Sequence, residues 1–263
     1  MEERQPQERG STLAEVFISL AITGIILAAV YALFISQNKS YIAQQDVIQL
    51  LQDSQNATNV LAKDLRMAGY GVPVATYPGN PCLGNPDNSC RITAASATSL
   101  TTNGNFRRVS PTLREFAASG QATLQVQSIT GFAVGDTIWI TNGTNSEPKT
   151  ISGITGGGSP SLTVNANLSN SYNAGSTVHQ SRTITYTYAN GTLSRTMGGV
   201  QQTLVQNVTA FSFTYTYSGA VSLTNIRQIM ASLTVQTAKA LPDTGKKRTV
   251  TFQTIVAPQN LAF

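Results

Sequence analysis

The sequence predicts an α+β fold, in which one long N-terminal α-helix packs on a β-rich C-terminal head and spans a membrane with its first half. Three observations lead to this prediction. Residues 16–38 carry no charge, and the chain then continues without proline or glycine to Ala68. Short alternating apolar patterns, separated by turn residues, follow in the second half of the chain. The helix therefore comes first, and the head takes the rest.

The composition is weakly charged, which suits an extracellular or assembled protein better than a cytosolic one. Charged residues make up 11% of the chain, against roughly 25% in ordinary soluble proteins. The net charge of +5 is scattered and is dense only at Arg107-Arg108 and at Lys246-Lys247-Arg248. The second cluster falls in a predicted hairpin turn, so we expect a solvated turn rather than a binding patch, and nucleic acid is not an expected partner.

The apolar run of residues 16–38 is long enough to cross a bilayer. A secretory signal peptide has a shorter core, of about 7–15 residues, and an Ala-x-Ala-like cleavage site, and neither feature is present here. A plain membrane anchor fits the length. Glu15 then has a local role, because Thr12-Leu13-Ala14-Glu15 matches the capping box of a helix start and a negative charge there suits the helix dipole.

Helical periodicity continues past the apolar run and predicts one unbroken helix over about residues 12–68. At 1.5 Å per residue its length is on the order of 85 Å. We take residues 11–38 as its transmembrane and assembly half and residues 39–70 as its amphipathic half. Glycine and then proline end the helix, at Gly69, Gly71 and Pro73. In the amphipathic half, apolar or small residues recur at spacings of three and four: Val47, Leu51, Ser54, Thr58, Leu61 and Leu65.

The sequence of the head, residues 71–263, predicts mostly β-structure. Residues 183–189 and 192–195 flank Asn190-Gly191, the strongest short signal for a hairpin. Alternating aromatic residues in 208–217 predict an aromatic row on one face of a strand. Residues 226–237 and 249–256 are further strands, joined by a turn at 242–245.

Residues 121–180 form a candidate insertion, which we expect to be a compact β subdomain. The three glycines Gly156-Gly157-Gly158 are similar to a glycine-rich phosphate-binding loop, but no Lys-Ser/Thr pair follows them. We therefore expect them to form the tip of a hairpin. Trp139 could bind carbohydrate, although a single Trp in an apolar strand is more often a core or subdomain contact.

The remaining chemistry-bearing residues predict no catalytic, metal or cofactor site. Cys82 and Cys90 enclose a turn-rich loop whose spacing matches no zinc or redox template, and a disulfide is the simplest account; it requires an oxidising compartment. His179 has no cysteine nearby, which suggests a surface or packing role. No G-x-S-x-G motif occurs, so we expect no enzyme.

The residues at the start of the predicted helix are Gly10-Ser11-Thr12-Leu13-Ala14-Glu15. This motif resembles the prepilin signature of type IV pilins and type II secretion pseudopilins, although the first mature residue is usually Phe rather than Ser. The resemblance implies that residues 1–10 are a leader, that a membrane peptidase cleaves between Gly10 and Ser11, and that Ser11 is then N-methylated.

The implied cleavage gives Glu15 a second role. It would create an α-ammonium group at Ser11, with a reference pKa near 7.7–8.0. A Glu15 carboxylate of a neighbouring subunit about 4 Å away would attract this group by about 4 kcal/mol at an effective dielectric constant near 20. We therefore expect Glu15 to guide subunit assembly, and helix capping in the monomer is compatible with that role.

Two further stretches narrow the resemblance: 64–71, which reads DLRMAGYG, and 183–217, which contains Leu193-Ser194-Arg195 and an aromatic strand. Both are similar to PilW-type minor pilins. The resemblance implies a minor pilin that primes or tips a type IV pilus, made as a single-pass inner-membrane prepilin with a periplasmic head and carried to the cell surface after assembly. It implies as partners other minor pilins, the major pilin, the prepilin peptidase, the inner-membrane assembly platform and, before assembly, membrane lipid.

Two alternatives stay open. The first is a minor pseudopilin of type II secretion, which the sequence separates poorly from a minor pilin. The second is a membrane-anchored protein whose head binds a ligand, in adhesion for example, through the insertion at 121–180.

Overall fold

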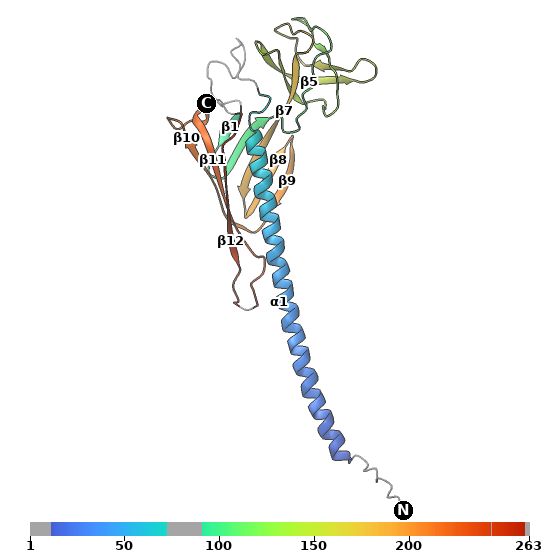
Figure 1. The fold of residues 1–263 in the computed structure, drawn as a ribbon, viewed down its shortest axis with the longest axis vertical. Helices are drawn as coiled ribbons and strands as arrows, with labels where there is room; N and C mark the ends of the chain where they lie inside the picture. Colours follow the sequence, from blue (N-terminus) through green and yellow to red (C-terminus); the bar gives the residue numbers. More distant parts are fainter. Residues whose placement is uncertain (1–11, 73–90, 243, 261–263) are drawn as a thin grey trace, which may run out of the picture. The chain divides into compact units, whose positions relative to one another are not determined.

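The computed structural model describes residues 12–72, 91–242 and 244–260, and over them it confirms the predicted α+β fold (Figure 1). In this part of the chain one long helix, α1 (Leu13–Met67), precedes the strands and a short 3-10 turn, η2 (Leu223–Asn225). The strands are β1 (Ile92–Ala95), β2 (Ser99–Gly104), β3 (Thr123–Gln125), β4 (Thr137–Thr141), β5 (Ser146–Thr155), β6 (Ser161–Val164), β7 (Thr177–Ala189), β8 (Thr192–Met197), β9 (Val200–Val205), β10 (Val208–Tyr217), β11 (Ile226–Gln236) and β12 (Thr249–Val256).

The described residues divide into two compact units. The first combines residues 12–49, which include the first part of α1, with the segment 237–248, which connects β11 to β12. The second contains the last turns of α1 and both β-sheets.

The helix α1 ends where its sequence predicts, because glycines follow it. Gly69 and Gly71 have φ angles of 78° and 70°, in the left-handed region that glycine adopts without steric cost. A Cβ atom at Gly69 would lie 2.7 Å from the side chain of Arg91 and 2.9 Å from the carbonyl of Asn260. The chain therefore turns at this point without room for a side chain.

One face of the second half of α1 is buried in the second unit. Its members recur at spacings of three and four, as expected for a helix lying on a core: Leu50, Ser54, Ala57, Leu61 and Leu65. The predicted positions Leu51 and Thr58 are only half-buried, since each lies one residue further round the helix from a buried neighbour. The Ser54 hydroxyl donates to the Leu50 carbonyl at 2.7 Å, so this buried polar group is satisfied within the helix.

The strands form two antiparallel sheets. The larger has the order β1-β2-β7-β4-β5-β6-β3, with β8 on β7 and β9 on β8, and the smaller has the order β10-β11-β12. Strand β7 pairs with β4 through its first residues, Thr177–Ser181, and with β2 and β8 through its later ones. Its residues contribute to two separate hydrophobic cores, Val178 to one and Tyr186 to the other.

The first core lies between the buried face of α1 and strands of both sheets. It contains Leu61 and Leu65 of α1, Tyr186 of β7, Phe213 of β10 and Ile229 of β11. In Figure 1 the last turns of α1, in cyan, are seen against β7 and β8, which hydrogen bonds from these strands to Asp64 confirm. This contact is the packing of a helix on antiparallel sheets that the sequence predicts.

The local hairpin and aromatic predictions are also confirmed. Asn190 and Gly191 have φ angles of 50° and 72°, as a type I′ turn requires, and they join β7 to β8. The aromatic row of β10 follows one face, with the rings of Phe211 and Phe213 packed edge to face at 4.8 Å between centroids. The row continues through Tyr215.

A second core is built mainly from the region predicted as an insertion. It contains residues of β3 to β6, together with Val178 of β7 and two residues upstream of that region, Leu113 and Ala117. Gly157, with φ at 98°, lies in the turn between β5 and β6, which confirms the predicted hairpin tip. Trp139 of β4 is buried against Val72, so its predicted packing role is confirmed as well.

Candidate assembly surface

The start of α1 forms the capping box that its sequence predicts. The Thr12 backbone N–H donates to Glu15 Oε2 at 2.8 Å, and the Glu15 N–H lies 3.4 Å from Thr12 Oγ1. The Glu15 carboxylate is solvent-exposed and lies in the first turn, where the helix dipole favours negative charge. Gly10 and Ser11, the predicted cleavage and methylation positions, lie outside the described residues.

The first half of α1 exposes apolar side chains on all sides. Its large hydrophobic residues between Leu13 and Phe34 are 53% to 78% exposed. Its most apolar stretch has a mean hydropathy of 2.5 and buries nothing within the described residues. By length and composition alone, α1 is one helix able to cross a membrane, although a signal sequence near an N-terminus has the same character.

Small residues recur along this half at spacings that bring them to one side of the helix. They follow one another after seven, three, four and four residues, which keeps them within about one quarter of the helix circumference at 3.6 residues per turn: Ala14, Ala21, Gly24, Ala28 and Ala32. We call this side the small-residue face. Small side chains allow the backbones of two helices in a membrane to approach closely.

A buried charge cluster fixes the other end of α1 to the larger sheet. Asp64 of α1 is 5% exposed. Its Oδ2 accepts hydrogen bonds from the Tyr186 hydroxyl of β7 and from Arg195 Nε of β8, both at 2.6 Å. Hydrogen bonds that involve a charged partner are shorter and stronger than neutral ones, so this cluster links the helix rigidly to two strands.

Burial and charge set the protonation states of Tyr186 and Arg195. Burial first, and then the negative charge of Asp64, raise the pKa of Tyr186 far above its ordinary value, so its hydroxyl keeps its proton and donates it. Burial on its own lowers the pKa of Arg195, but the hydrogen bond and charge of Asp64 outweigh this and raise it. Arg195 therefore stays cationic opposite Asp64.

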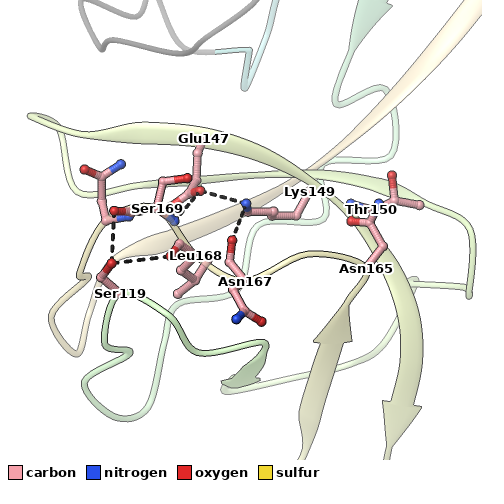
Figure 2. A network of polar contacts seen from close by, with 9 residues as sticks. Ser119, Glu147, Lys149, Thr150, Asn165, Asn167, Leu168 and Ser169 are labelled. Carbon is pink, nitrogen blue, oxygen red and sulfur yellow. Dashed lines mark hydrogen bonds and ion pairs between the residues drawn. The ribbon is translucent and has the colours of Figure 1, made fainter.

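A second polar network stabilises the region around the second core (Figure 2). Glu147 of β5 is 2% exposed and accepts hydrogen bonds from the backbone N–H groups of Ser169 and Asn170. Lys149 Nζ lies 3.0 Å from Glu147 Oε2 and donates to the Asn167 carbonyl at 2.6 Å, so it connects the two, as Figure 2 shows. Burial raises the pKa of Glu147, but these hydrogen bonds and the Lys149 charge outweigh it and lower the pKa overall.

The other residues that the sequence singles out are His179, Cys82 and Cys90. His179 is half-buried; its Nδ1 lies 2.8 Å from Ser110 Oγ, and burial lowers its pKa. Its ring packs edge-on against Tyr70, which fits the predicted packing role. Cys82 and Cys90, the predicted disulfide, lie outside the described residues. Within the described residues, no group of three His, Cys, Asp or Glu side chains could hold a metal ion.

Comparison with known proteins does not assign the chain to a family. No protein-family model matches the sequence, and no curated protein matches it. The fold itself combines a long apolar N-terminal helix with antiparallel sheets packed against the later part of that helix. The architecture is pilin-like.

The predictions from the sequence do not include the two carboxylates that are buried within the described residues, Asp64 and Glu147. Asp64 and Arg195 both stand in stretches that resemble PilW-type proteins, but nothing in either stretch indicates that they meet, because 131 positions separate them. The burial of Asp64 did have a signal in the sequence, because Asp64 is a charged residue on the apolar side of the helix. It lies three residues after Leu61 and directly precedes Leu65. Glu147 lies between Ser146 and Pro148, with Lys149 next, and no apolar pattern surrounds it, so its burial had no signal in the local sequence.

Proposed function

We propose that this chain is a minor pilin of a type IV pilus. It is made as a prepilin, cleaved after Gly10, and assembled through the first half of α1 to prime or tip the filament. Its partners are other minor pilins, the major pilin, the prepilin peptidase and the inner-membrane assembly platform. Before assembly the helix lies in lipid, with the head in the periplasm; after assembly the subunit is part of a pilus at the cell surface.

One observation carries this proposal: a single helix is buried in a head at one end and exposes apolar side chains all round at the other. Each large side chain in the exposed half would be stabilised by up to roughly 1.5–3 kcal/mol on full burial. Over the whole half the gain is on the order of 20 kcal/mol. Such a helix needs lipid or other apolar helices around it, and the small-residue face suits close contact with a second helix.

The capping box is compatible with an assembly role for Glu15. A carboxylate has two oxygens and about four lone-pair sites, so Glu15 can accept from the Thr12 N–H and from other donors at the same time. In the proposed filament that partner is the Ser11 amine of a neighbouring subunit.

The first test is the intact mass of protein purified from membranes of cells that contain the peptidase. We expect a chain that has lost residues 1–10 and gained one methyl group on Ser11. A chain that still begins at Met1 in those cells would contradict the prepilin assignment.

The second test separates the capping role of Glu15 from its charge. Glutamine can replace glutamate in a capping box, so Glu15→Gln keeps the hydrogen bond to Thr12 and removes only the charge, whereas Glu15→Ala removes both. If the charge aligns subunits, both variants should be processed and inserted normally but should enter pili at least tenfold less, as an attraction of about 4 kcal/mol permits. If Glu15→Gln enters pili normally and Glu15→Ala does not, the charge of Glu15 has no role in assembly and the side chain acts only as a helix cap.

A mature wild-type chain that stays in the membrane and does not enter pili would favour the second candidate, a membrane-anchored protein with a ligand-binding head. The specific observation in its favour is that the capping box already accounts for Glu15 locally. A minor pseudopilin of type II secretion shares the proposed mechanism, and crosslinking of the mature chain to a pilin or to a pseudopilin in cells decides between the two.

A further inference from the structure

The segment that connects β11 to β12, residues 237–248, lies beside α1 in the first unit. A groove of about 650 Å³ runs between them, lined on the helix by residues from Ala32 to Asp46 and on the segment by residues from Thr237 to Pro242. A second groove has Ala43, Val47 and Ile48 on one side and Leu241 and Pro242 on the other. Leu241 and Pro242 border both grooves, so the segment faces the helix at about the level of Ala43.

This level of the helix is where its apolar run ends. Residues 16–38 are uncharged, and Lys39 is the first charged residue after Glu15. The run spans about 34 Å at 1.5 Å per residue, slightly more than a hydrocarbon core of about 30 Å. Tyr31 and Tyr41 are 66% and 59% exposed on either side of this boundary, and tyrosine is enriched where a transmembrane helix meets the headgroups.

The segment is strongly cationic for its length. It contains Lys239, Lys246, Lys247 and Arg248 and a single acidic residue, Asp243, so its net charge is +3 (four cations minus one anion). All four cationic side chains are exposed. None of them takes part in the three ion pairs found within the described residues.

We propose that this segment, the basic loop (residues 237–248), is a second membrane contact that binds the phosphates of anionic phospholipid headgroups. The inference rests on the proposed insertion of α1, because insertion brings the basic loop to the height of the headgroups. Lysine and arginine near an anionic surface are attracted to it. The apolar groove residues beside Lys39 and Lys239 suit the first acyl-chain segments of a lipid whose phosphate meets these lysines.

The test is acetylation of lysines, read out by mass spectrometry, on the full chain in vesicles. One set contains phosphatidylcholine alone and the other contains added phosphatidylglycerol. Each cation near the anionic surface should favour the bound loop by about fivefold. We therefore expect Lys239, Lys246 and Lys247 to react at least about tenfold more slowly in the anionic vesicles, and high salt should restore their reactivity by screening. Lys63, exposed in the second unit, is the internal control and should react alike in both.

Substitution completes the test. The triple variant K246Q/K247Q/R248Q should abolish the lipid-dependent protection of Lys239, whereas the matched variant Lys63→Gln should leave it unchanged. Equal reactivity of the loop lysines in the two kinds of vesicle overturns the proposal, and so does protection that follows protein density rather than lipid charge, which would indicate a second copy of the chain as the partner. Flotation with the vesicles is measured separately: a chain that does not float refutes membrane anchoring, whereas one that floats with unprotected lysines refutes only the lipid contact.

Discussion

Replacement of Asp64 by alanine should destabilise the head more than any surface substitution on α1. The carboxylate is 5% exposed and holds the Tyr186 hydroxyl and Arg195 Nε, each at 2.6 Å. Removing it leaves a half-buried guanidinium and a buried hydroxyl without this acceptor. Breaking one partner of a buried ion pair typically costs about 3–5 kcal/mol, because the remaining charge is uncompensated. At roughly 2–4 °C per kcal/mol for a protein of about this size, the melting temperature should fall by about 6–20 °C.

The measurement is denaturant and thermal unfolding of the full chain in detergent, followed by circular dichroism in the β-sheet region. Asp53→Ala is the matched control, since Asp53 is exposed on the same helix, and it should change stability by no more than about 0.5 kcal/mol. Asp64→Asn should fall between the two, because the amide oxygen still accepts from Tyr186 but no longer neutralises Arg195. If Asp64→Ala and Asp53→Ala unfold at the same denaturant concentration, the cluster does not hold the helix to the sheet.

Two further substitutions test other contacts by the same unfolding measurements. Gly104→Ala should lower the free energy of unfolding by about 1–3 kcal/mol, because the new Cβ would lie 2.8 Å from the Met67 carbonyl. The control Gly158→Ala, whose Cβ meets nothing within 4 Å, should be neutral. Equal stability of the two variants would show that the backbone near Gly104 moves to accept the methyl group at no cost. For Glu147 the pKa is lower in the folded chain than its ordinary value of 4.5. Its contribution to stability is therefore present above about pH 4.5 and is lost as pH falls through the lower folded value. Glu147→Gln should be less stable than wild type at pH 7, with a difference that shrinks below about pH 4; a constant difference would refute this assignment.

The elements of the fold could be predicted because their signals are local. The spacing of apolar residues in α1, the glycines that end it and the Asn190-Gly191 turn each act over a few neighbouring residues. The same holds for the capping box, in which Thr12 and Glu15 lie one helical turn apart. Physical rules for helices and turns apply at this range whatever the rest of the chain does.

The contacts of the head could not be predicted in the same way. The sequence does not show that Leu50, rather than Leu51, is the buried residue. Both are apolar, and only the position of the sheets selects the one that is buried. Strand β7 contributes to both cores, and the second core also includes Leu113 and Ala117. Each of these outcomes depends on which strands become neighbours.

By itself the sequence determined a long helix, apolar first and amphipathic later, followed by antiparallel strands with defined turns. This is so because backbone sterics and hydrophobic periodicity operate between near neighbours. Only the tertiary structure decided that Asp64 meets Arg195, that Glu147 is buried against the backbone of Ser169 and Asn170, and that the basic loop lies beside the end of the apolar run. Those pairings join residues far apart in the chain, and their energies depend on distance and burial, which exist only after the chain has folded.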